Sequence, residues 1–505
     1  MQILPPDIEV EVRRRPARVS EAALARTDAA AFVLDERDPA GALAGLPHAS
    51  LWTALHRRAR RGDAPPLLVA RLPNARHTLA AVGFLKHGAG AYERLDLAGR
   101  LMRELVQGGV RSMQCHAAGF EPQESAAVLE ALASGALAAA APMPQRKSRP
   151  VPAAELRTLD VHGGRAEDLA FATSVAAGNH LARWLTTLPP NELDCVAYRR
   201  ALARLARRQG WSFRFYDERA LARLGAGAFL AVSRANAHRG AGIVHLGYRP
   251  RGAAARRRVA LVGKGICFDT GGVNLKTHKG MYRMHGDMQG SAVAVGTLLA
   301  LQRLGVPVGV DCWLALTENE IGPRAFRPQE VVRAMNGVTI QVVHSDAEGR
   351  MVLADALALA SRAKPALVLD FATLTGACVN ALTERYSGAF TNHAVLETLL
   401  QAAGRAGGER VWCFPMDEDF DGELDSPIAD IMQCTLDSKG DHILAARFLS
   451  RFVPKDVAWA HIDLSSSERK GGLAHVPTEI TGFGVRFAAH LLGDGTLLEQ
   501  LGSRK

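Results

Sequence analysis

The chain has 505 residues, of which 48% are hydrophobic and 22% are charged. These values are ordinary for a globular protein, so they exclude a disordered or fibrous chain, and the length predicts two domains or three. The net charge of +10 divides equally between residues 1–150 and the remainder, which favours solvated arginines over one concentrated nucleic-acid surface.

Three sequence features set the expected location of the protein. No segment approaches the roughly 18 consecutive apolar residues of a membrane span. The first residues, MQILPPDIEVEVRRR, are charged and broken by prolines where a signal peptide would be apolar. The seven cysteines are scattered without a CxxC pair, which is poor material for a disulfide framework. We therefore expect a cytoplasmic protein that does not associate with membranes.

Residues 1–145 have the pattern of a small α/β domain. The short apolar runs AAFVLD, PPLLVARL and TLAAVGFL alternate with amphipathic stretches such as ESAAVLEALASGALAAA. The segment APMPQRKSRPVPAAE, residues 141–155, then brings four prolines and a basic cluster. This composition is typical of a domain boundary, and we place a linker at residues 146–164.

From residue 165 to residue 505, apolar runs alternate with amphipathic helices. We expect strands at RVALVGKG (258–265), GVDCWLAL (309–316), residues 339–343, PALVLDFATL (365–374) and VAWAHIDLS (457–465). We expect helices at residues 291–304, 351–363 and 442–453. Continuous apolar strands between amphipathic helices predict an α/β domain whose sheet is covered on both faces.

Charged residues gather in a glycine-rich segment, GKGICFDTGGVNLKTHKGMYRMHGDMQGSAVAVG, residues 263–296. Lys264 ends an apolar strand, and Asp269, Lys276 and Asp287 follow in irregular sequence where the backbone can approach closely. Only ten of the 61 basic residues are lysine, so lysines kept here indicate a task that a guanidinium cannot perform, such as giving up a proton.

A second charged segment, HSDAEGRMVLADAL, covers residues 344–357. It places Asp346, Glu348 and Arg350 at alternate positions just before an expected helix. In an extended segment that spacing puts the three side chains on one face. We therefore expect them to converge with the carboxylates of the first segment.

Four carboxylates directed into one cavity repel one another unless divalent cations neutralise them. Taken singly, three of these residues could have a purely structural role. Asp269 could be a turn residue, Glu348 a charge at a helix N-terminus, and Arg350 a surface cation. Their joint spacing favours a two-metal hydrolase that uses Zn²⁺ or Mn²⁺, with Lys276 stabilising the oxyanion. The spacing GxxxxGK[ST] of a phosphate loop is absent from this sequence, which argues against nucleotide binding.

These segments resemble the signature blocks of the leucyl aminopeptidase (cytosol aminopeptidase) family. GKGICFDTGGVNLK, MHGDMQG and HSDAEGRMVLADAL match the family pattern in order and spacing. Further family-like pieces, including LPPNEL (188–193), DFATLTGAC (370–378) and TGFGVRFAAHLL (481–492), extend the resemblance over residues 165–505. The resemblance implies a catalytic domain with a mixed β-sheet flanked by helices, which hydrolyses the N-terminal residue from peptides.

The resemblance also implies a role for each matching residue. One metal ion would be held by Lys264, Asp269, Asp287 and Glu348, and the other by Asp269, Asp346 and Glu348. Lys264 would be a ligand only as the neutral amine, which an arginine cannot provide. Lys276 would polarise the scissile carbonyl, and Arg350 would orient a bicarbonate that acts as general base. The substrate pocket would be lined by Met284, Thr373, Leu374 and Gly376.

Several residues depart from the family pattern. His344 opens the DAEGR block, Gln289 stands where glycine is usual, and Ser465 stands where a small apolar residue is usual. The sequence KGDHIL places Asp441 and His442 in a turn that is usually glycine-rich. Ser465 either admits polar or small substrate side chains or bonds to nearby backbone. His344 is interpreted as a structural histidine rather than a ligand of a third metal.

Two functions from different classes follow. The leading one is a cytoplasmic aminopeptidase with two Mn²⁺ or Zn²⁺ ions, acting on short peptides with a free N-terminus; by resemblance it is a hexamer of two trimers. The alternative is a DNA-binding or regulatory protein that uses the basic clusters RRRPAR (13–18) and RRARR (57–61). These clusters lack interleaved aromatic residues, so DNA is not favoured as a partner. A catalytically inert homologue is disfavoured because all seven metal and catalytic positions are present.

Overall fold

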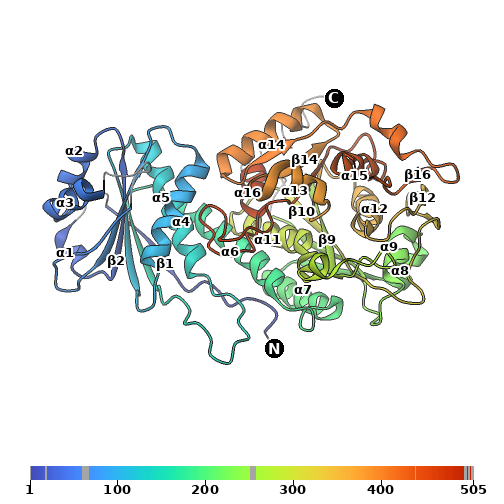
Figure 1. Cartoon of the computed structure of the whole chain (residues 1–505), viewed down its shortest axis with the longest axis horizontal. Coiled ribbons are helices and arrows are strands. Elements are labelled where there is room, and N and C mark those ends of the chain that lie inside the picture. The colour runs from blue at the N-terminus through green and yellow to red at the C-terminus, as the bar shows by residue number, and fades with distance from the viewer. Residues whose placement is uncertain are drawn as a thin grey trace.

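Two separate helix-covered β-sheets divide the chain into an N-terminal and a C-terminal domain (Figure 1). The structure is a computed structural model, and it describes residues 2–16, 20–59, 67–250, 258–437, 439–493, 497–498 and 501. A third, small sheet of three strands lies in the C-terminal domain and consists of β11 (Val331–Arg333), β12 (Thr339–Gln341) and β16 (Ile431–Met432). The expected α/β class is therefore confirmed.

The N-terminal sheet has six strands in the order β1-β6-β5-β2-β4-β3. They are β1 (Glu11–Arg15), β6 (Thr158–His162), β5 (Ser112–Ala118), β2 (Ala29–Asp35), β4 (Leu79–Leu85) and β3 (Leu68–Arg71). All neighbours are parallel except β3 and β4. The helices of this domain are α1 (Glu21–Leu24), α2 (Pro39–Ala44), α3 (Ala49–Ala59), α4 (Ala91–Leu105) and α5 (Pro122–Ala140). They bury β2 from both faces, which explains its unbroken apolar run.

The prediction of a linker at residues 146–164 is wrong for the last part of that segment. Residues 158–162 form β6, which pairs with β1 on one side and β5 on the other. Leu159 and Val161 are fully buried and alternate with the less buried Thr158 and Asp160, so the short segment has the period of a strand. The prolines nearby hid this signal, and the first domain therefore ends after β6.

The C-terminal sheet has eight strands in the order β15-β14-β17-β13-β9-β10-β8-β7. They are β15 (Val411–Cys413), β14 (Ser387–Thr391), β17 (Trp459–Asp463), β13 (Leu367–Ala372), β9 (Arg258–Asp269), β10 (Gly309–Asn319), β8 (Gly242–Tyr248) and β7 (Ser212–Asp217). The four central strands, β17, β13, β9 and β10, are parallel, and antiparallel pairs flank them. The sheet is thus mixed, as the resemblance implied.

Helices cover both faces of this sheet and enclose two hydrophobic cores. One face packs against α6 (Ala166–Thr187), α7 (Cys195–Gln209), α11 (Gln289–Arg303), α14 (Ala394–Gly407) and α16 (Val485–Leu492). The other packs against α8 (Glu218–Arg223), α9 (Gly227–Ser233), α12 (Glu348–Ser361) and α15 (Asp441–Ser450). Two short helices, α10 (His278–Met281) and α13 (Gly376–Leu382), follow β9 and β13. No helix in the described part of the chain has the length and hydropathy needed to cross a membrane.

Helix α11 lies unusually close to the middle of the sheet. A Cβ atom on Gly263 of β9 would lie 2.5 Å from Ser291 Cα, and one on Gly290 would lie 2.1 Å from the carbonyl oxygen of Phe371. Only glycine permits this approach. It fixes the strand that carries Lys264 and Asp269 against the helix that follows Asp287.

The two domains are joined by buried polar contacts. Arg486 of α16 forms an ion pair with Glu130 of α5, with N–O distances of 2.7 and 2.9 Å, and its side chain is 3% exposed. The guanidinium of Arg410 lies between the rings of Tyr92 and Tyr386, 3.7 and 4.3 Å from their centres. These contacts hold the N-terminal domain against the C-terminal domain.

Candidate metal centre

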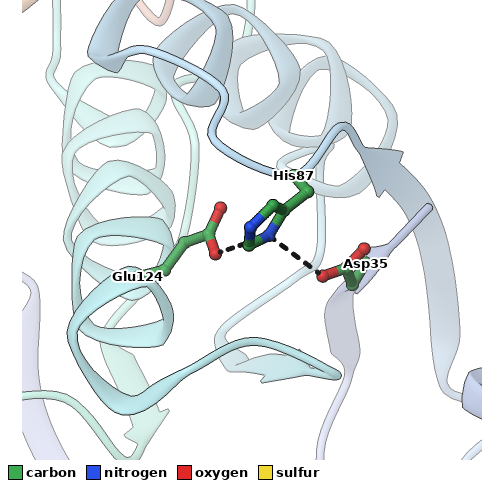
Figure 2. A group of neighbouring side chains, drawn as sticks. All are labelled: Asp35, His87 and Glu124. Atoms are coloured by element: carbon green, nitrogen blue, oxygen red, sulfur yellow. Dashed lines mark ion pairs between the residues drawn. The ribbon is translucent and has the colours of Figure 1, made fainter. Parts of the chain in front are cut away.

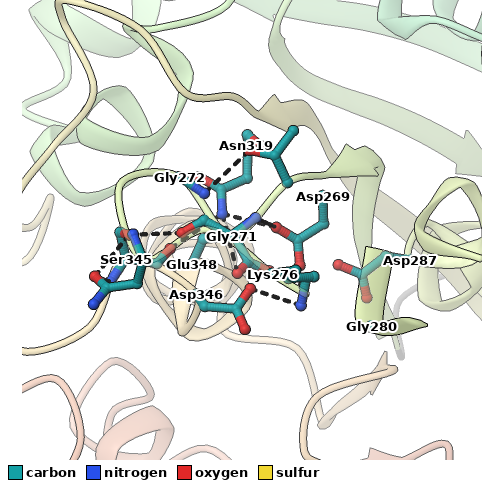
Figure 3. A network of polar contacts seen from close by, with 12 residues as sticks. Asp269, Gly271, Gly272, Lys276, Gly280, Asp287, Asn319, Ser345, Asp346 and Glu348 are labelled. Carbon is teal, nitrogen blue, oxygen red and sulfur yellow. Dashed lines mark hydrogen bonds and ion pairs between the residues drawn. The ribbon is translucent and has the colours of Figure 1, made fainter. Parts of the chain in front are cut away.

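Carboxylates from two separate segments of the sequence meet at the end of strand β9 (Figure 3). Asp269 is the last residue of β9, Glu348 is the first residue of α12, and Asp346 precedes α12 by two residues. One oxygen from each of these side chains lies within 4.8 Å of the others. Asp269 and Glu348 are buried. The structure therefore brings together residues that are up to 79 positions apart in the sequence.

Lys264 closes one side of this group. Its Nζ lies 2.7 Å from Asp287 Oδ1 and 3.1 Å from Glu348 Oε1, and it donates to the carbonyl oxygen of Thr373 at 2.9 Å. The hydroxyl of Thr373 also donates to Asp287 Oδ1, at 2.7 Å. Asp287 Oδ2 is buried and has no hydrogen-bond partner among the described residues. One carboxylate oxygen beside Lys264 thus remains free for a cation.

Lys276 closes the other side. Its Nζ lies 2.9 Å from Asp269 Oδ2 and 2.6 Å from Asp346 Oδ1 (Figure 3). Burial opposes the charge on Lys276, but the carboxylates of Asp269 and Glu348 outweigh this effect and raise its pKa above the ordinary range. Lys276 is therefore a permanent cation beside the carboxylates.

The electrostatics of the group are those of crowded, buried acids. Burial and the charge of Asp269 raise the pKa of Glu348 to about 8. Burial raises the pKa of Asp287 to about 6, although Lys264 opposes this change. Burial also raises the pKa of Asp346. Burial opposes the charge on Lys264, yet the surrounding carboxylates raise its pKa well above the usual value. Without cations, this centre retains protons.

Asn319, which the sequence analysis missed, holds the carboxylates in place. Its Nδ2 donates to Asp269 Oδ1 at 2.8 Å and approaches Glu348 Oε2 at 3.4 Å. Asp269 Oδ1 also accepts from the backbone N–H of Gly271 at 2.8 Å. Asn319 ends β10, next to the end of β9. A polar residue at the end of an apolar strand, in LALTENE, was the signal that could have identified it.

Arg350 does not join the carboxylates, so the expectation of one shared face for residues 346, 348 and 350 is wrong. The helix α12 begins at Glu348, and residues two apart in an α-helix point about 200° away from each other. Glu348 faces the centre, whereas Arg350 Nη2 donates to both carboxylate oxygens of Asp441, at 2.8 and 3.0 Å. Arg350 Nη1 donates to the carbonyl oxygen of Gln433 at 3.1 Å.

A cavity of about 430 Å³ opens beside Asp287. Two of the four expected pocket residues, Met284 and Thr373, line it together with Gln289 and Ser465. The other two do not. Leu374 donates its backbone N–H to Asp463 Oδ1 at 3.1 Å and packs against the core, and Gly376 is exposed at the start of α13.

The departures from the family pattern have distinct places in this site. Ser465 Oγ donates to the carbonyl oxygen of Tyr386 at 2.7 Å, which is the backbone-bonding alternative. Gln289 is 2% exposed, and its Oε1 has no partner within the described chain, so a buried amide oxygen borders the cavity. His344 is exposed, and its Nδ1 accepts the backbone N–H of Asp346 at 3.2 Å. The structural reading of His344 is consistent with this bond.

A second group of metal-binding residue types lies in the N-terminal domain (Figure 2). His87 Nδ1 lies 3.8 Å from Asp35 Oδ2 and 3.4 Å from Glu124 Oε2. Arg37 already donates to both oxygens of Asp35, and the backbone N–H of Gly88 donates to Glu124. Because protein donors occupy these carboxylates, we interpret the group as an ion-pair network.

The set of ligand residues at this site fits divalent cations. Four carboxylates contact or adjoin two lysines. The pKa of Asp287 is raised to about 6 and that of Glu348 to about 8, and Asp287 Oδ2 is buried without a hydrogen-bond partner among the described residues. Oxygen-rich ligand groups of this kind suit Mn²⁺ and Zn²⁺. A mixed sheet with such a centre beside a substrate-sized cavity defines a metal-dependent hydrolase.

Comparisons with known proteins identify the hydrolase. Residues 180–489 match the cytosol aminopeptidase family, catalytic domain. A probable cytosol aminopeptidase from Geobacter sulfurreducens is 36% identical over 436 residues, covering 84% of this chain and 86% of the relative. One from Synechococcus sp. (strain CC9605) is 40% identical over 337 residues, covering 66% and 68%. The chain belongs to the cytosol aminopeptidase family and is a metal-dependent aminopeptidase.

Solved structures share the whole fold. The bottromycin maturation enzyme BotP in complex with Mn superposes with a TM-score of 0.81 at 31% identity, covering 92% of this chain and 99% of that one. A mutant tomato leucine aminopeptidase has a TM-score of 0.82 at 24% identity, covering 97% and 98%, and shows the same fold. The family resemblance that the sequence analysis stated for residues 165–505 is thereby confirmed, and the family model matches residues 180–489 of that range.

The DNA-binding alternative gains no support from these comparisons. Of its two basic clusters, residues 17–18 and 60–61 lie outside the described residues. In β1, Arg13 pairs with Glu11, Arg15 pairs with Asp160 at 3.0 Å, and Arg14 donates to the carbonyl oxygen of Gly164. The described arginines of the first cluster are therefore engaged within the domain.

Proposed function

We propose that the chain is a two-metal aminopeptidase that removes the N-terminal residue from short peptides. Lys264, Asp269, Asp287 and Glu348 would hold one ion, and Asp269, Asp346 and Glu348 the other. The observation that carries this proposal is the convergence of three carboxylate oxygens within 4.8 Å of one another, beside a free oxygen of Asp287. Two divalent ions, Mn²⁺ or Zn²⁺, supply an activated water and polarise a carbonyl group.

The two lysines have different tasks in this proposal. Lys264 must give up its proton to become a ligand, and its present contacts with Asp287 and Glu348 place the nitrogen where it would bind. Lys276 keeps its proton. The Lys276 side chain is 17% exposed, so a substrate can reach its ammonium group, which would stabilise negative charge on the scissile carbonyl oxygen.

The cavity beside Asp287 is the proposed site for the N-terminal side chain of the substrate. It is lined by one proposed metal ligand, Asp287, and by Met284 and Thr373. A volume of about 430 Å³ holds one side chain and the adjoining backbone. A free α-amino group would bind at the metal end, which restricts cleavage to the first residue.

We also propose a cytoplasmic homohexamer built from two trimers. Large apolar side chains of the C-terminal domain are exposed: Leu275, Tyr282, Ile321, Ile428 and Leu436 are 54 to 91% exposed. Exposed apolar surface of this kind marks an interface between subunits. Six chains of 54.1 kDa would sediment as a particle of about 325 kDa.

A panel of aminoacyl chromogenic substrates tests the function. The protein is stripped with a chelator, reloaded with Mn²⁺ or Zn²⁺, and compared with its Glu348→Gln variant and with Glu397→Gln, a matched change on an exposed helix face. We expect the chromophore to be released only when metal is present and the substrate has a free N-terminus. Glu348→Gln should lose this activity, and Glu397→Gln should keep it. Hydrolysis that survives chelation, or none with any substrate, would contradict the proposal.

A further inference from the structure

Arg350 is a buried cation that needs a partner. Its side chain is 2% exposed, and a guanidinium removed from water without a counter-charge is strongly destabilising. The residue lies in the first turn of α12, two positions after the proposed ligand Glu348. An exogenous oxyanion such as bicarbonate is one partner that such a guanidinium could take.

In this chain the partner is a carboxylate from another helix. Asp441 is the first residue of α15, and both of its oxygens accept from Arg350 Nη2, at 2.8 and 3.0 Å. The position also suits the aspartate, because the N-terminal turn of a helix stabilises a negative charge. The Asp441 side chain is 21% exposed, so solvent reaches one side of this ion pair.

A second guanidinium nitrogen, Nη1, bonds to the loop before α15, whereas the buried Nε has no hydrogen-bond partner among the described residues. Arg350 Nη1 donates to the carbonyl oxygen of Gln433 at 3.1 Å. The side chain of Gln433 in turn accepts from the backbone N–H groups of Val343 and His344 and donates to the carbonyl oxygen of Ala347. Arg350 is thus tied to the segment that carries Asp346, and a free anion at Nη2 would have to displace Asp441.

We propose that Asp441 is a positioning residue that takes the place of a free oxyanion on Arg350. The enzyme then hydrolyses peptides without bicarbonate, because the anion is built into the chain. This inference rests on the proposed aminopeptidase function, and it removes bicarbonate from the set of expected cofactors.

The test compares the metal-loaded wild type with Asp441→Asn in carbon-dioxide-free buffer and in bicarbonate, at constant pH and ionic strength. We expect bicarbonate to change wild-type kcat less than twofold. Asp441→Asn should lose about tenfold or more in kcat, since a misdirected group near the reacting atoms has effects of this size. Added bicarbonate should restore the kcat of Asp441→Asn, and this restoration should saturate as the bicarbonate concentration rises. Asp419→Asn, which removes an exposed carboxylate, is the matched control.

Binding is measured separately from activity, by the line width of ¹³C-bicarbonate in the NMR spectrum and by the shift in Tm. We expect saturable broadening and a rise in Tm for Asp441→Asn only. The double variant Arg350→Gln/Asp441→Asn should show neither, which locates the anion at Arg350. The activity of Asp441→Glu, which keeps a carboxylate, should remain independent of bicarbonate. This variant is the control for a folding defect caused by substitution at position 441.

Three results would overturn the inference: saturable stimulation of the wild type by bicarbonate, bicarbonate binding by the wild type, or no rescue and no binding in a folded Asp441→Asn. If no variant hydrolyses any substrate, the proposed function fails. The NMR comparison still decides whether Asp441 excludes bicarbonate, so the two failures are distinguishable.

Discussion

Metal binding should release protons from this centre, in a number that depends on pH. The metal-free carboxyl of Glu348 has a pKa raised to about 8 by burial and by the charge of Asp269, and that of Asp287 is raised to about 6. The surrounding acids keep Lys264 charged. Because ligands bind metal in their deprotonated forms, each protonated group must lose its proton when Mn²⁺ enters.

The magnitude follows from these pKa values. At pH 7 about nine-tenths of the Glu348 side chains and about one-tenth of the Asp287 side chains carry a proton, and Lys264 contributes one more. We therefore expect about two protons released at pH 7. At pH 9 the acids are almost fully ionised, and about one proton remains, from Lys264. The affinity for Mn²⁺ should rise about 100-fold per pH unit near pH 7 and about tenfold near pH 9.

Isothermal titration calorimetry of Mn²⁺ in buffers of different ionisation enthalpy measures this number directly. The Lys264→Met variant has no lysine proton to lose, but it also lacks the charge that lowers the pKa of Asp287 and Glu348. It should therefore release about one proton fewer than the wild type at the highest pH of the series, where both acids are ionised in both proteins. Proton release that is the same at pH 7 and pH 9 would refute the assignment of the raised pKa to a ligand carboxyl. Release at that highest pH that is unaffected by Lys264→Met would refute the role of the lysine as a neutral ligand.

Three further predictions use the same structure. Lys276→Met should lower kcat by about 10²- to 10³-fold while Mn²⁺ still binds, as measured by kinetics and calorimetry, because it removes a donor to the oxyanion. Gly349→Ala should weaken Mn²⁺ binding, since its Cβ would lie 2.5 Å from Lys264 Cε, and unchanged affinity would contradict this reasoning. Glu130→Gln should lower the free energy of unfolding in urea by about 3 kcal/mol, because it leaves Arg486 buried without a counter-charge; a loss below about 1 kcal/mol would show that solvent reaches the pair.

Much of the fold and the chemical content of the site could be predicted from the sequence. The strands expected at 258–265, 309–316 and 365–374 are β9, β10 and β13, because unbroken apolar runs are typical of strands buried on both faces. Each run was followed by a charged or polar residue, and the carboxyl ends of parallel strands share one edge of the sheet. The predicted convergence of acids and lysines followed from that edge.

The remainder depends on contacts between distant segments, which periodicity does not encode. The strand β6 is only five residues long and becomes a strand because β1 and β5 leave a place between them. The partner of Arg350 is 91 positions away, at the start of α15. The local sequence around Arg350 indicated a charge but not the direction in which the first turn of α12 would point it.

The two lysines kept at this centre have a physical explanation. Lys264 and Lys276 balance the carboxylates before any metal binds, so the centre can form during folding without leaving four like charges unpaired. An arginine could fill that first task at either position. Only a lysine can then change from counter-ion to ligand, because its amine gives up a proton when divalent charge arrives, whereas a guanidinium does not. Position 264 therefore excludes arginine on chemical grounds, and position 350, which needs a permanent cation paired with Asp441, accepts it.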